Sequence, residues 1–297
     1  MKKKSICFLN GRFLETARAG VPATDRGFLF GEALFETWKT YRGKPFALPE
    51  HLTRMAKAAK ILGIPFDPKE SWENRSLELA RRNGMADCGG AVRLTISAGP
   101  GKVSLIPDTE GRPTRLMLFR PLEPGLENAR HDGVGVHLMD FGVGVNARLR
   151  NMKTVNYVPA VMGKVAARKH RCFESLYRLA DSTVLEGTTS NFFVVKRGKL
   201  YTTPVAEGIL PGVTRALTLG LAKGLVPIIE GRLTERDLLA ADEVFLTSSS
   251  IEVVPVIRVD KHPIAGARPG EITRELQRRY RRLVSRRLGM AVEDLGV

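Results

Sequence analysis

Strand-like and helix-like stretches follow one another along this chain without a strict alternation of one strand and one helix. Residues 35–41, 91–97 and 115–119 alternate in the manner of strands, whose successive side chains point to opposite faces. Residues 49–62 carry apolar side chains at the spacing of one helical face, and Gly63 then ends the helix. The mixture favours an α/β (mixed α+β) fold over a doubly wound parallel sheet.

Turn residues and periodicity predict the remaining elements. Asn10-Gly11 predicts a tight hairpin between strands at 8–12 and 18–24. The same reasoning predicts further helices at 70–82, 157–170, 214–223 and 272–288, and further strands at 134–139, 175–179, 191–196 and 243–247.

The chain has 297 residues, which is long enough for two domains with a core each. Pro121, Pro124 and Gly125 interrupt the periodic pattern. We therefore predict a small N-terminal α/β domain at residues 1–120, a linker at 121–130 and a large C-terminal domain at 131–297.

The formal net charge is +16, and much of the excess lies between residues 274 and 287. Arginines there alternate with apolar residues at helical spacing, namely Ile272, Leu276, Tyr280, Leu283 and Leu288. Basic chains attract nucleic acids and anionic membranes. The solvated face of a packed terminal helix explains the pattern without any partner, so we expect no nucleic-acid partner and keep nucleic-acid binding by this helix as a remote alternative.

The spacing of the cysteines and histidines argues against disulfide bonds and metal sites. Cys7, Cys88 and Cys172 lie far apart, so neither a disulfide framework nor a zinc site is indicated. The histidines also lack the spacing of metal ligands, and we expect no metal site. No apolar run approaches the length that spans a membrane, and a reducing cytoplasm is the expected location.

Lys153 lies in the segment Asn151-Met152-Lys153-Thr154-Val155-Asn156-Tyr157, just before a predicted helix. Partial burial would lower the pKa of such a lysine and make its amine a nucleophile and base. A loop lysine considered alone is ordinarily a solvated surface residue. Here four further motifs accompany it in a fixed order: His51 to Arg54, Leu185 to Asn191, Leu210 to Arg215 and Thr247 to Ser250.

These ordered motifs resemble those of the class IV (fold type IV) pyridoxal phosphate-dependent aminotransferases. The resemblance runs from about residue 8 to residue 259, and the family includes branched-chain aminotransferases, D-amino acid aminotransferases and aminodeoxychorismate lyases. It implies pyridoxal 5′-phosphate as the cofactor. It also implies a homodimer and the two-domain fold type IV architecture with an active site in the interdomain cleft.

The resemblance assigns roles to individual residues. Lys153, in the predicted C-terminal domain, matches the lysine that binds the cofactor and shuttles the Cα proton of the substrate. Glu186 matches the carboxylate that pairs with the pyridine nitrogen, and Tyr157 matches the phenol that hydrogen-bonds the ring oxygen. The expected phosphate donors are the Arg54 side chain, the Ser249 hydroxyl and the backbone amides of Val213 and Thr214, which begin a helix.

Substrate contacts follow from the same comparison. The backbone amides of Ser250 and Ile251 match the groups that bind the substrate carboxylate, and Thr189 lies where the side-chain pocket begins. Arg93 is a second candidate for the carboxylate, although a strand arginine equally pairs with structural acids. Thr37 stands where branched-chain enzymes often carry glycine, which is closer to the lyases and D-enzymes.

D-Amino acid aminotransferases of the best-known type carry an Arg-x-His motif in the loop that corresponds to residues 99–107. This chain has Lys102-Val103-Ser104 there. The sequence therefore favours a cytoplasmic transaminase that moves an amino group between an aliphatic or branched-chain amino acid and a 2-oxo acid, with aminodeoxychorismate lyase or D-amino acid transaminase activity as the alternative.

Overall fold

The computed structural model describes residues 5–107, 112–141 and 147–295. Contacts divide the chain into two compact units. Unit 1 comprises Met1–Leu122, Met152–Asn156 and Arg287–Val297, and unit 2 comprises Glu123–Asn151 and Tyr157–Arg286. The segment that carries Lys153 thus groups with unit 1, whereas the sequence prediction placed it in the C-terminal domain. The division of the chain into separately folding domains stays a prediction.

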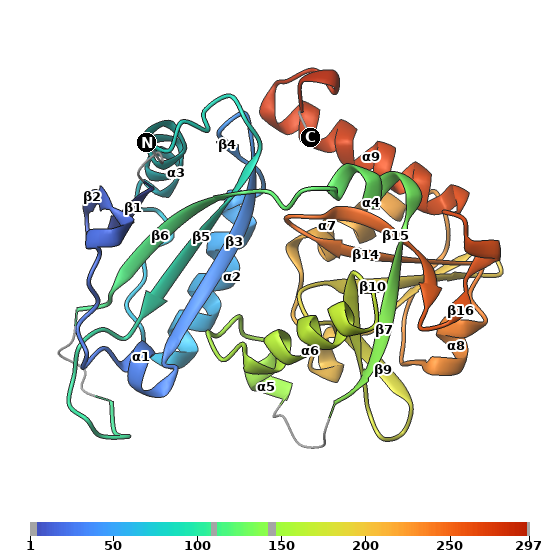
Figure 1. Ribbon diagram of the computed structural model, residues 1–297, viewed down its shortest axis with the longest axis horizontal. Coiled ribbons are helices and arrows are strands. Elements are labelled where there is room, and N and C mark those ends of the chain that lie inside the picture. Colours follow the sequence, from blue (N-terminus) through green and yellow to red (C-terminus); the bar gives the residue numbers. More distant parts are fainter. Residues whose placement is uncertain (1–4, 108–111, 142–146, 296–297) are drawn as a thin grey trace. The chain divides into compact units, whose positions relative to one another are not determined.

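Unit 1 contains an antiparallel sheet with helices packed on it (Figure 1). Its strands lie in the order β2-β1-β6-β5-β3-β4. The strands are β1 (Ile6–Leu9), β2 (Arg12–Glu15), β3 (Ala33–Tyr41), β4 (Lys44–Pro45), β5 (Gly90–Ser97) and β6 (Arg115–Pro121). The helices are α1 (Arg26–Phe30), α2 (Leu48–Leu62) and α3 (Trp72–Arg82), with a 3-10 turn at Thr16–Arg18.

The core of unit 1 lies between the sheet and helices α2 and α3. Trp38 of β3 is fully buried against Leu52 and Met55 of α2 and Leu79 of α3. The amphipathic pattern at 49–62 therefore predicted α2 correctly, because its apolar face is the one that packs on β3.

The predicted hairpin turn at Asn10-Gly11 is confirmed, but the second strand was placed wrongly. β1 pairs with β2 at Arg12–Glu15, and the expected strand at 18–24 is not formed. Asn10 and Gly11 both have positive φ angles, which suits a two-residue turn and requires the return strand to start at once.

Unit 2 contains a mixed sheet in the order β12-β11-β10-β14-β15-β7-β8-β9-β13, with β16 paired to β15. Its strands are β7 (Val134–Asp140), β8 (Glu174–Arg178), β9 (Thr183–Gly187), β10 (Asn191–Lys196), β11 (Lys199–Thr202), β12 (Ile228–Glu230), β13 (Leu233–Thr234), β14 (Glu243–Ser248), β15 (Glu252–Val259) and β16 (His262–Pro263). Its helices are α4 (Leu126–Asp132), α5 (Ala147–Arg150), α6 (Val158–Lys169), α7 (Val213–Ala222), α8 (Glu235–Leu239) and α9 (Glu271–Leu288), whose last two residues belong to unit 1. Short 3-10 turns occur in this unit at Val205–Glu207 and Ala265–Ala267, and another, Glu293–Leu295, belongs to unit 1.

Helix α6 approaches the chain after β9 so closely that it needs glycine at one position. A Cβ atom on Gly163 would lie 2.2 Å from Cγ2 of Thr188. The Gly163 carbonyl oxygen accepts a hydrogen bond of 2.7 Å from the Ser175 hydroxyl of β8. This close packing fixes the start of α6, where Tyr157 is the N-cap, relative to β8 and β9.

The predicted linker at 121–130 contains regular structure. Helix α4 begins at Leu126 after its N-cap Gly125, which has a positive φ of +79°. Leu126 and Arg130 are buried in unit 2, so α4 packs as part of that unit. The Pro and Gly residues that suggested a linker mark the entry to a helix.

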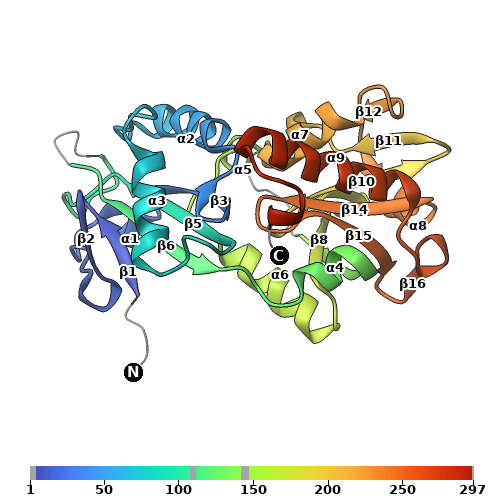
Figure 2. The ribbon, with the colours of Figure 1, turned by 90° about the horizontal axis from the view of Figure 1, so that it is seen from above.

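The basic terminal helix α9 is packed, as expected. Leu276, Tyr280 and Val284 are buried, and the Arg274 guanidinium donates to the carbonyl oxygen of Arg130 in α4, which lies beside α9 in Figures 1 and 2. Glu275 pairs with arginines on its own helix. Within the residues that the structure describes, no helix combines the length and apolar character needed to cross a membrane.

Candidate functional site

The Lys153 segment runs beside strand β3 in unit 1. The backbone N–H of Phe35 donates to the carbonyl oxygen of Lys153 at 2.9 Å, and the N–H of Val155 donates to the carbonyl oxygen of Ala33 at 3.1 Å. Leu34 and Thr154 form an antiparallel bridge between these two hydrogen bonds. Main-chain pairing on both sides therefore holds the lysine backbone in a fixed position.

The Phe35 ring organises the cations next to this segment. The Lys153 ammonium lies 4.4 Å from the ring centroid, and the Arg93 guanidinium lies 3.5 Å from it. Arg93 Nε also donates to the Thr95 hydroxyl at 3.3 Å, and Arg93 lies opposite Thr37 in the register of β5 and β3. The structure thus brings three predicted residues together in unit 1: Thr37 on β3, Arg93 opposite it on β5, and Lys153 in the segment beside β3.

Arg54 is the predicted phosphate arginine, and the structure places its guanidinium on a buried carboxylate. Arg54 Nε donates to Glu36 Oε1 and Nη2 donates to Glu36 Oε2, each at 2.7 Å. His51 Nδ1 lies 2.7 Å from the same Oε2. Burial alone would raise the pKa of Glu36, but the positive charge of Arg54 and the contact with His51 lower it to about 2.

Burial lowers the pKa of His51, and the charges of Arg54 and Lys153 lower it further, although Glu36 opposes the shift. The imidazole is therefore neutral at neutral pH, and the nitrogen that faces Glu36 carries the hydrogen. The influence of the Lys153 charge on His51 shows that these two side chains belong to the same electrostatic environment in unit 1.

Glu186 is the buried carboxylate of unit 2. Its Oε2 accepts hydrogen bonds from Asn191 Nδ2 at 3.2 Å and from the backbone N–H of Leu210 at 3.0 Å. Its Oε1 lies 3.3 Å from Nη2 of Arg150. These contacts hold the carboxylate in place near the end of β9.

Leu210, whose N–H contacts Glu186, lies three residues before helix α7 begins at Val213. Gly212 is the N-cap of this helix, and a Cβ atom there would lie 2.0 Å from Oδ1 of Asn191, so the position requires glycine. Within the described residues no side chain caps α7, whose first amides belong to Val213 and Thr214. An uncapped N-terminus of this kind favours an anion such as a phosphate.

The hydroxyl run at 247–250 lies next to this helix start. Thr247 of β14 pairs in register with Asn191 of β10, and the chain turns through 249–251 before β15 begins at Glu252. The Thr247 hydroxyl is buried without a hydrogen-bond partner among the described residues, while Ser249, Ser250 and Ile251 are partly exposed. The structure therefore gathers Glu186, Val213, Thr214 and the 249–251 turn within unit 2.

Tyr157 and Thr189 have more complex surroundings. Burial raises the pKa of the Tyr177 phenol, the charges of Glu174 and Glu186 and a smaller influence of Tyr157 add to the shift, and Arg150 opposes it, so Tyr157 and Glu186 both lie near Tyr177. The Thr189 hydroxyl donates to Glu174 Oε2 at 2.8 Å. A substrate contact by the Thr189 side chain stays a prediction.

Comparison with known proteins places this arrangement in a family. The family model for amino-transferase class IV matches residues 33–259. A protein of Methanocaldococcus jannaschii, provisionally named a branched-chain-amino-acid aminotransferase, is 34% identical over 92% of this chain and 94% of its own length. The chain belongs to the class IV aminotransferase family. The resemblance found in the motifs is thereby confirmed, and the cofactor of this family is pyridoxal 5′-phosphate.

Other relatives of this aminotransferase carry different activities in their names. The D-alanine aminotransferase of Staphylococcus aureus is 31% identical over 93% of the chain and 97% of its own length. The aminodeoxychorismate lyase of Bacillus subtilis is 30% identical over 93% of the chain and 94% of its own length. The branched-chain aminotransferase of Thermoproteus uzoniensis, solved with norvaline, is 27% identical, covers 98% of this chain and 97% of its own, and superposes with a TM-score of 0.84. The fold type IV architecture is therefore confirmed.

The side chains and amides of the aminotransferase fit this cofactor. A lysine amine, a buried carboxylate and an arginine are present, as the chemistry of an aldehyde, a pyridine nitrogen and a phosphate requires. The crowded Gly212 and the partnerless Thr247 hydroxyl, both next to Asn191, mark one place where a polar group of a ligand would be bound. Groups of metal-binding side chains are absent from the described residues.

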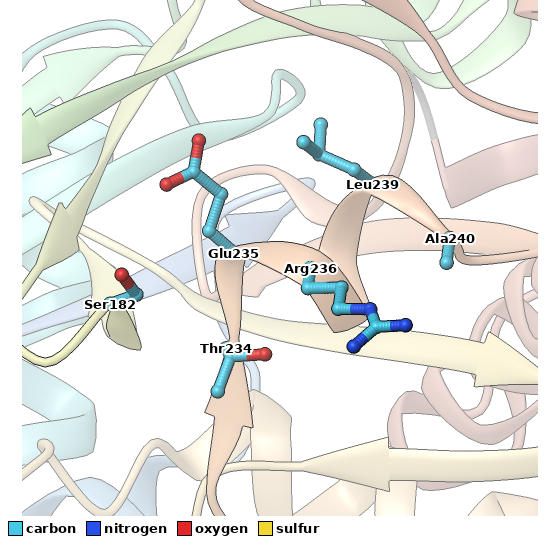
Figure 3. A pocket seen from close by; sticks show the side chains of 6 residues that line it. All are labelled: Ser182, Thr234, Glu235, Arg236, Leu239 and Ala240. Atoms are coloured by element: carbon cyan, nitrogen blue, oxygen red, sulfur yellow. The ribbon is translucent and has the colours of Figure 1, made fainter.

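A surface pocket of about 600 Å³ in unit 2 has a different character (Figure 3). It is lined by Ser182, Thr234, Glu235, Arg236, Leu239 and Ala240. Its polar groups are engaged in structure, because Thr234 caps the short helix α8 and Glu235 pairs with Arg178 at 2.6 Å. The pocket does not contain the motifs that define the family.

Sequence reasoning missed several residues that contact the predicted ones. Asn191 lies inside the motif Leu185 to Asn191, Glu36 directly precedes the predicted Thr37, and helical spacing alone would have placed His51 beside Arg54. Arg150 lies in the basic segment before Lys153, and no pattern in the sequence distinguishes it from the neighbouring Arg148.

Proposed function

We propose that this aminotransferase transfers the amino group of an aliphatic amino acid, with branched-chain substrates favoured, to a 2-oxo acid. The similarity to the Methanocaldococcus protein supports the substrate class. The lack of Arg-x-His at Lys102-Val103-Ser104 argues against the best-known D-amino acid type. Thr37 and the Bacillus relative keep aminodeoxychorismate lyase activity as the second candidate.

The observation that carries the proposal is the environment of Glu186. Glu186 is buried, and Arg150, Asn191 and the Leu210 amide contact its carboxylate, whose oxygens can accept a hydrogen bond from a protonated pyridine nitrogen. When bound, the cofactor supplies an electron sink for the electrons left on Cα when its proton is removed. Glu186 strengthens that sink by keeping the proton on the ring nitrogen.

The remaining roles belong to other residues of the chain. We assign to Lys153 the covalent attachment of the cofactor and the movement of the substrate Cα proton, and to Tyr157 a hydrogen bond to the ring oxygen. Arg54, the amides of Val213 and Thr214, and Ser249 bind the phosphate. Ser250 and Ile251 bind the substrate carboxylate through their amides, with Arg93, Thr37 and Thr189 near the substrate.

Half-reaction spectroscopy tests the reaction type. The holoenzyme mixed with L-leucine, L-valine or L-glutamate and no acceptor should change its visible absorbance within one turnover, and 2-oxoglutarate should restore it. D-Alanine in the same experiment tests the D-transaminase alternative. If none of these amino acids changes the spectrum and aminodeoxychorismate yields pyruvate and p-aminobenzoate, the enzyme is a lyase.

We also propose a homodimer in a reducing cytoplasm. Val158, Val161, Met162 and Val165 recur at helical spacing on α6, and each is more than half exposed. A contiguous apolar stripe of this kind is typical of an interface between subunits. Cys7, Cys88 and Cys172 are free thiols, which suits a reducing compartment. Sedimentation of the holoenzyme and of Val161→Asp tests the dimer: the wild type should sediment as two subunits and the variant as one.

A further inference from the structure

Glu36 is a buried acid on β3 that faces helix α2. Its two oxygens contact His51 and Arg54, which lie one helical turn apart on α2. The side chains of Glu36 and His51 are 1% exposed, and that of Arg54 is 12% exposed. The strand and the helix therefore meet at an ion pair in the protein interior.

A buried ion pair costs desolvation free energy when it joins a strand to a helix. Removing two charges from water costs free energy that the attraction between them only partly offsets, and apolar residues of similar size often stabilise a fold as well. The neighbouring contacts between Trp38, Leu52 and Met55 already join β3 to α2 through apolar packing. The acid at position 36 therefore calls for an explanation other than packing.

The geometry of the pair supplies one. Arg54 engages Glu36 through Nε and Nη2 together, which fixes both the plane and the rotation of its guanidinium. A guanidinium carries five N–H donors in a rigid fork, so a two-point contact along one edge determines the direction of the others. The neutral His51 holds the carboxylate from the same helix without adding a charge that would compete with Arg54.

We propose that Glu36 is a positioning residue for the phosphate of the cofactor, that it acts through Arg54, and that His51 supports it. This inference rests on the proposed role of Arg54 in phosphate binding. Arginine that is free to rotate must be ordered when the phosphate binds, whereas arginine held by Glu36 is ordered beforehand. The simpler alternative is that Glu36 only stabilises unit 1.

The phosphate contribution can be isolated by comparing two ligands, pyridoxal 5′-phosphate and pyridoxal, which lacks the phosphate. The dissociation constant of pyridoxal divided by that of pyridoxal 5′-phosphate, both measured with the apoenzyme, reports how much the phosphate adds to binding. In Glu36→Gln we expect this ratio to fall roughly tenfold, with pyridoxal binding nearly unchanged, because a misplaced arginine loses charge-assisted bonds to phosphate. A purely structural role would weaken both ligands equally.

Two further variants test the route through Arg54. Arg54→Ala should lower the ratio by itself, and adding Glu36→Gln to it should cause no further fall, as expected for residues that act as a unit. Glu36→Asp keeps the charge but shortens the side chain, so it should lower the ratio less than Glu36→Gln does. If Glu36→Gln does not fold, Glu36→Asp tests the proposal in its place.

Glu70→Gln is the matched control, since Glu70 also pairs with two arginines of unit 1, Arg75 at 2.6 Å and Arg115 at 2.7 Å. It should keep the wild-type ratio. If Arg54→Ala lowers the ratio while the Glu36 variants leave it unchanged, the positioning role is overturned and the assignment of Arg54 survives. An unchanged ratio in Arg54→Ala rejects the assignment of Arg54 itself, and the positioning role with it.

Discussion

Glu36 of unit 1 and Glu186 of unit 2 are both buried carboxylates with an arginine partner, yet they are held very differently. Glu36 receives two short bonds from Arg54 and a third from His51, each at 2.7 Å. Glu186 has a longer contact of 3.3 Å with Arg150, and its other donors are an amide side chain and a backbone N–H.

The difference agrees with the roles that we propose, in which Glu36 orients Arg54 and Glu186 meets the cofactor. The charge of Glu36 is balanced by a two-point pair within the protein. Glu186 is contacted by Arg150 and by two neutral donors, and we propose that it meets the pyridine nitrogen of the cofactor. The two residues should therefore fail in different ways when they are changed.

The comparison presupposes that the cofactor is attached at Lys153, and the largest effect is expected there. Lys153→Ala removes both the attachment point and the base, so turnover should fall below detection, while the fold persists because the segment is held by main-chain bonds. The exposed Lys199→Ala is the control and should be fully active. Borohydride reduction followed by peptide mapping should label Lys153, and a label on any other lysine contradicts the assignment.

The pH dependence of stability should reveal the Glu36 pair. Its pKa is lowered from 4.5 to about 2, so the stabilisation is complete above pH 4.5 and is lost as the pH falls toward 2. A shift of this size corresponds to about 3 kcal/mol. Denaturant unfolding measures the free energy of unfolding at about pH 5 and about pH 2.5. The wild type should lose more of this free energy between the two pH values than Glu36→Gln does, by an amount of this order. If the free energy of unfolding falls equally with pH in the two proteins, the pair contributes no pH-dependent stability.

Glu186→Gln should spare cofactor binding and slow the chemistry. An amide cannot hold the pyridinium proton by charge, and we expect single-turnover transamination to slow on the order of a hundredfold. Glu235→Gln, which breaks a surface pair with Arg178 in the same unit, should react at the wild-type rate. An unchanged rate in Glu186→Gln would assign the residue a structural role and remove the contrast with Glu36.

The sequence predicted those parts of the fold whose signal is local. Helix α2 follows from its apolar face, and the first turn follows from Asn10-Gly11, because each depends on neighbouring residues. The strand expected at 18–24 failed because alternation there had no pairing partner, whereas Arg12–Glu15 did. Short strands such as β13 exist only through their pairing with distant β9, which no local pattern reveals.

In the candidate site too, the sequence predicted residues that lie in local motifs and missed contacts that depend on the fold. Lys153, Glu186, Val213 and Thr214 could be proposed from the sequence because they lie in motifs with family-like spacing. Asn191 was visible inside such a motif and Glu36 beside the predicted Thr37, but their partners were not, since the contacts join β3 to α2 and β9 to β10. Arg150 could not be found, because only the fold selects one arginine among several to face Glu186.

The smallest expected effects distinguish the phosphate donors. Arg54→Ala should weaken cofactor affinity roughly tenfold or more and Ser249→Ala only a few-fold, because charge-assisted bonds are about twice as strong as neutral ones. Arg54→Ala also leaves the buried Glu36 without its cation, so it should lose stability, whereas Ser249→Ala, in a partly exposed turn, should not. Titration of the apoenzyme and a thermal melt of each variant measure the two effects. Variants that keep wild-type affinity and lose turnover would move both residues to the substrate side of the site, and Glu36 would then orient an arginine for the substrate.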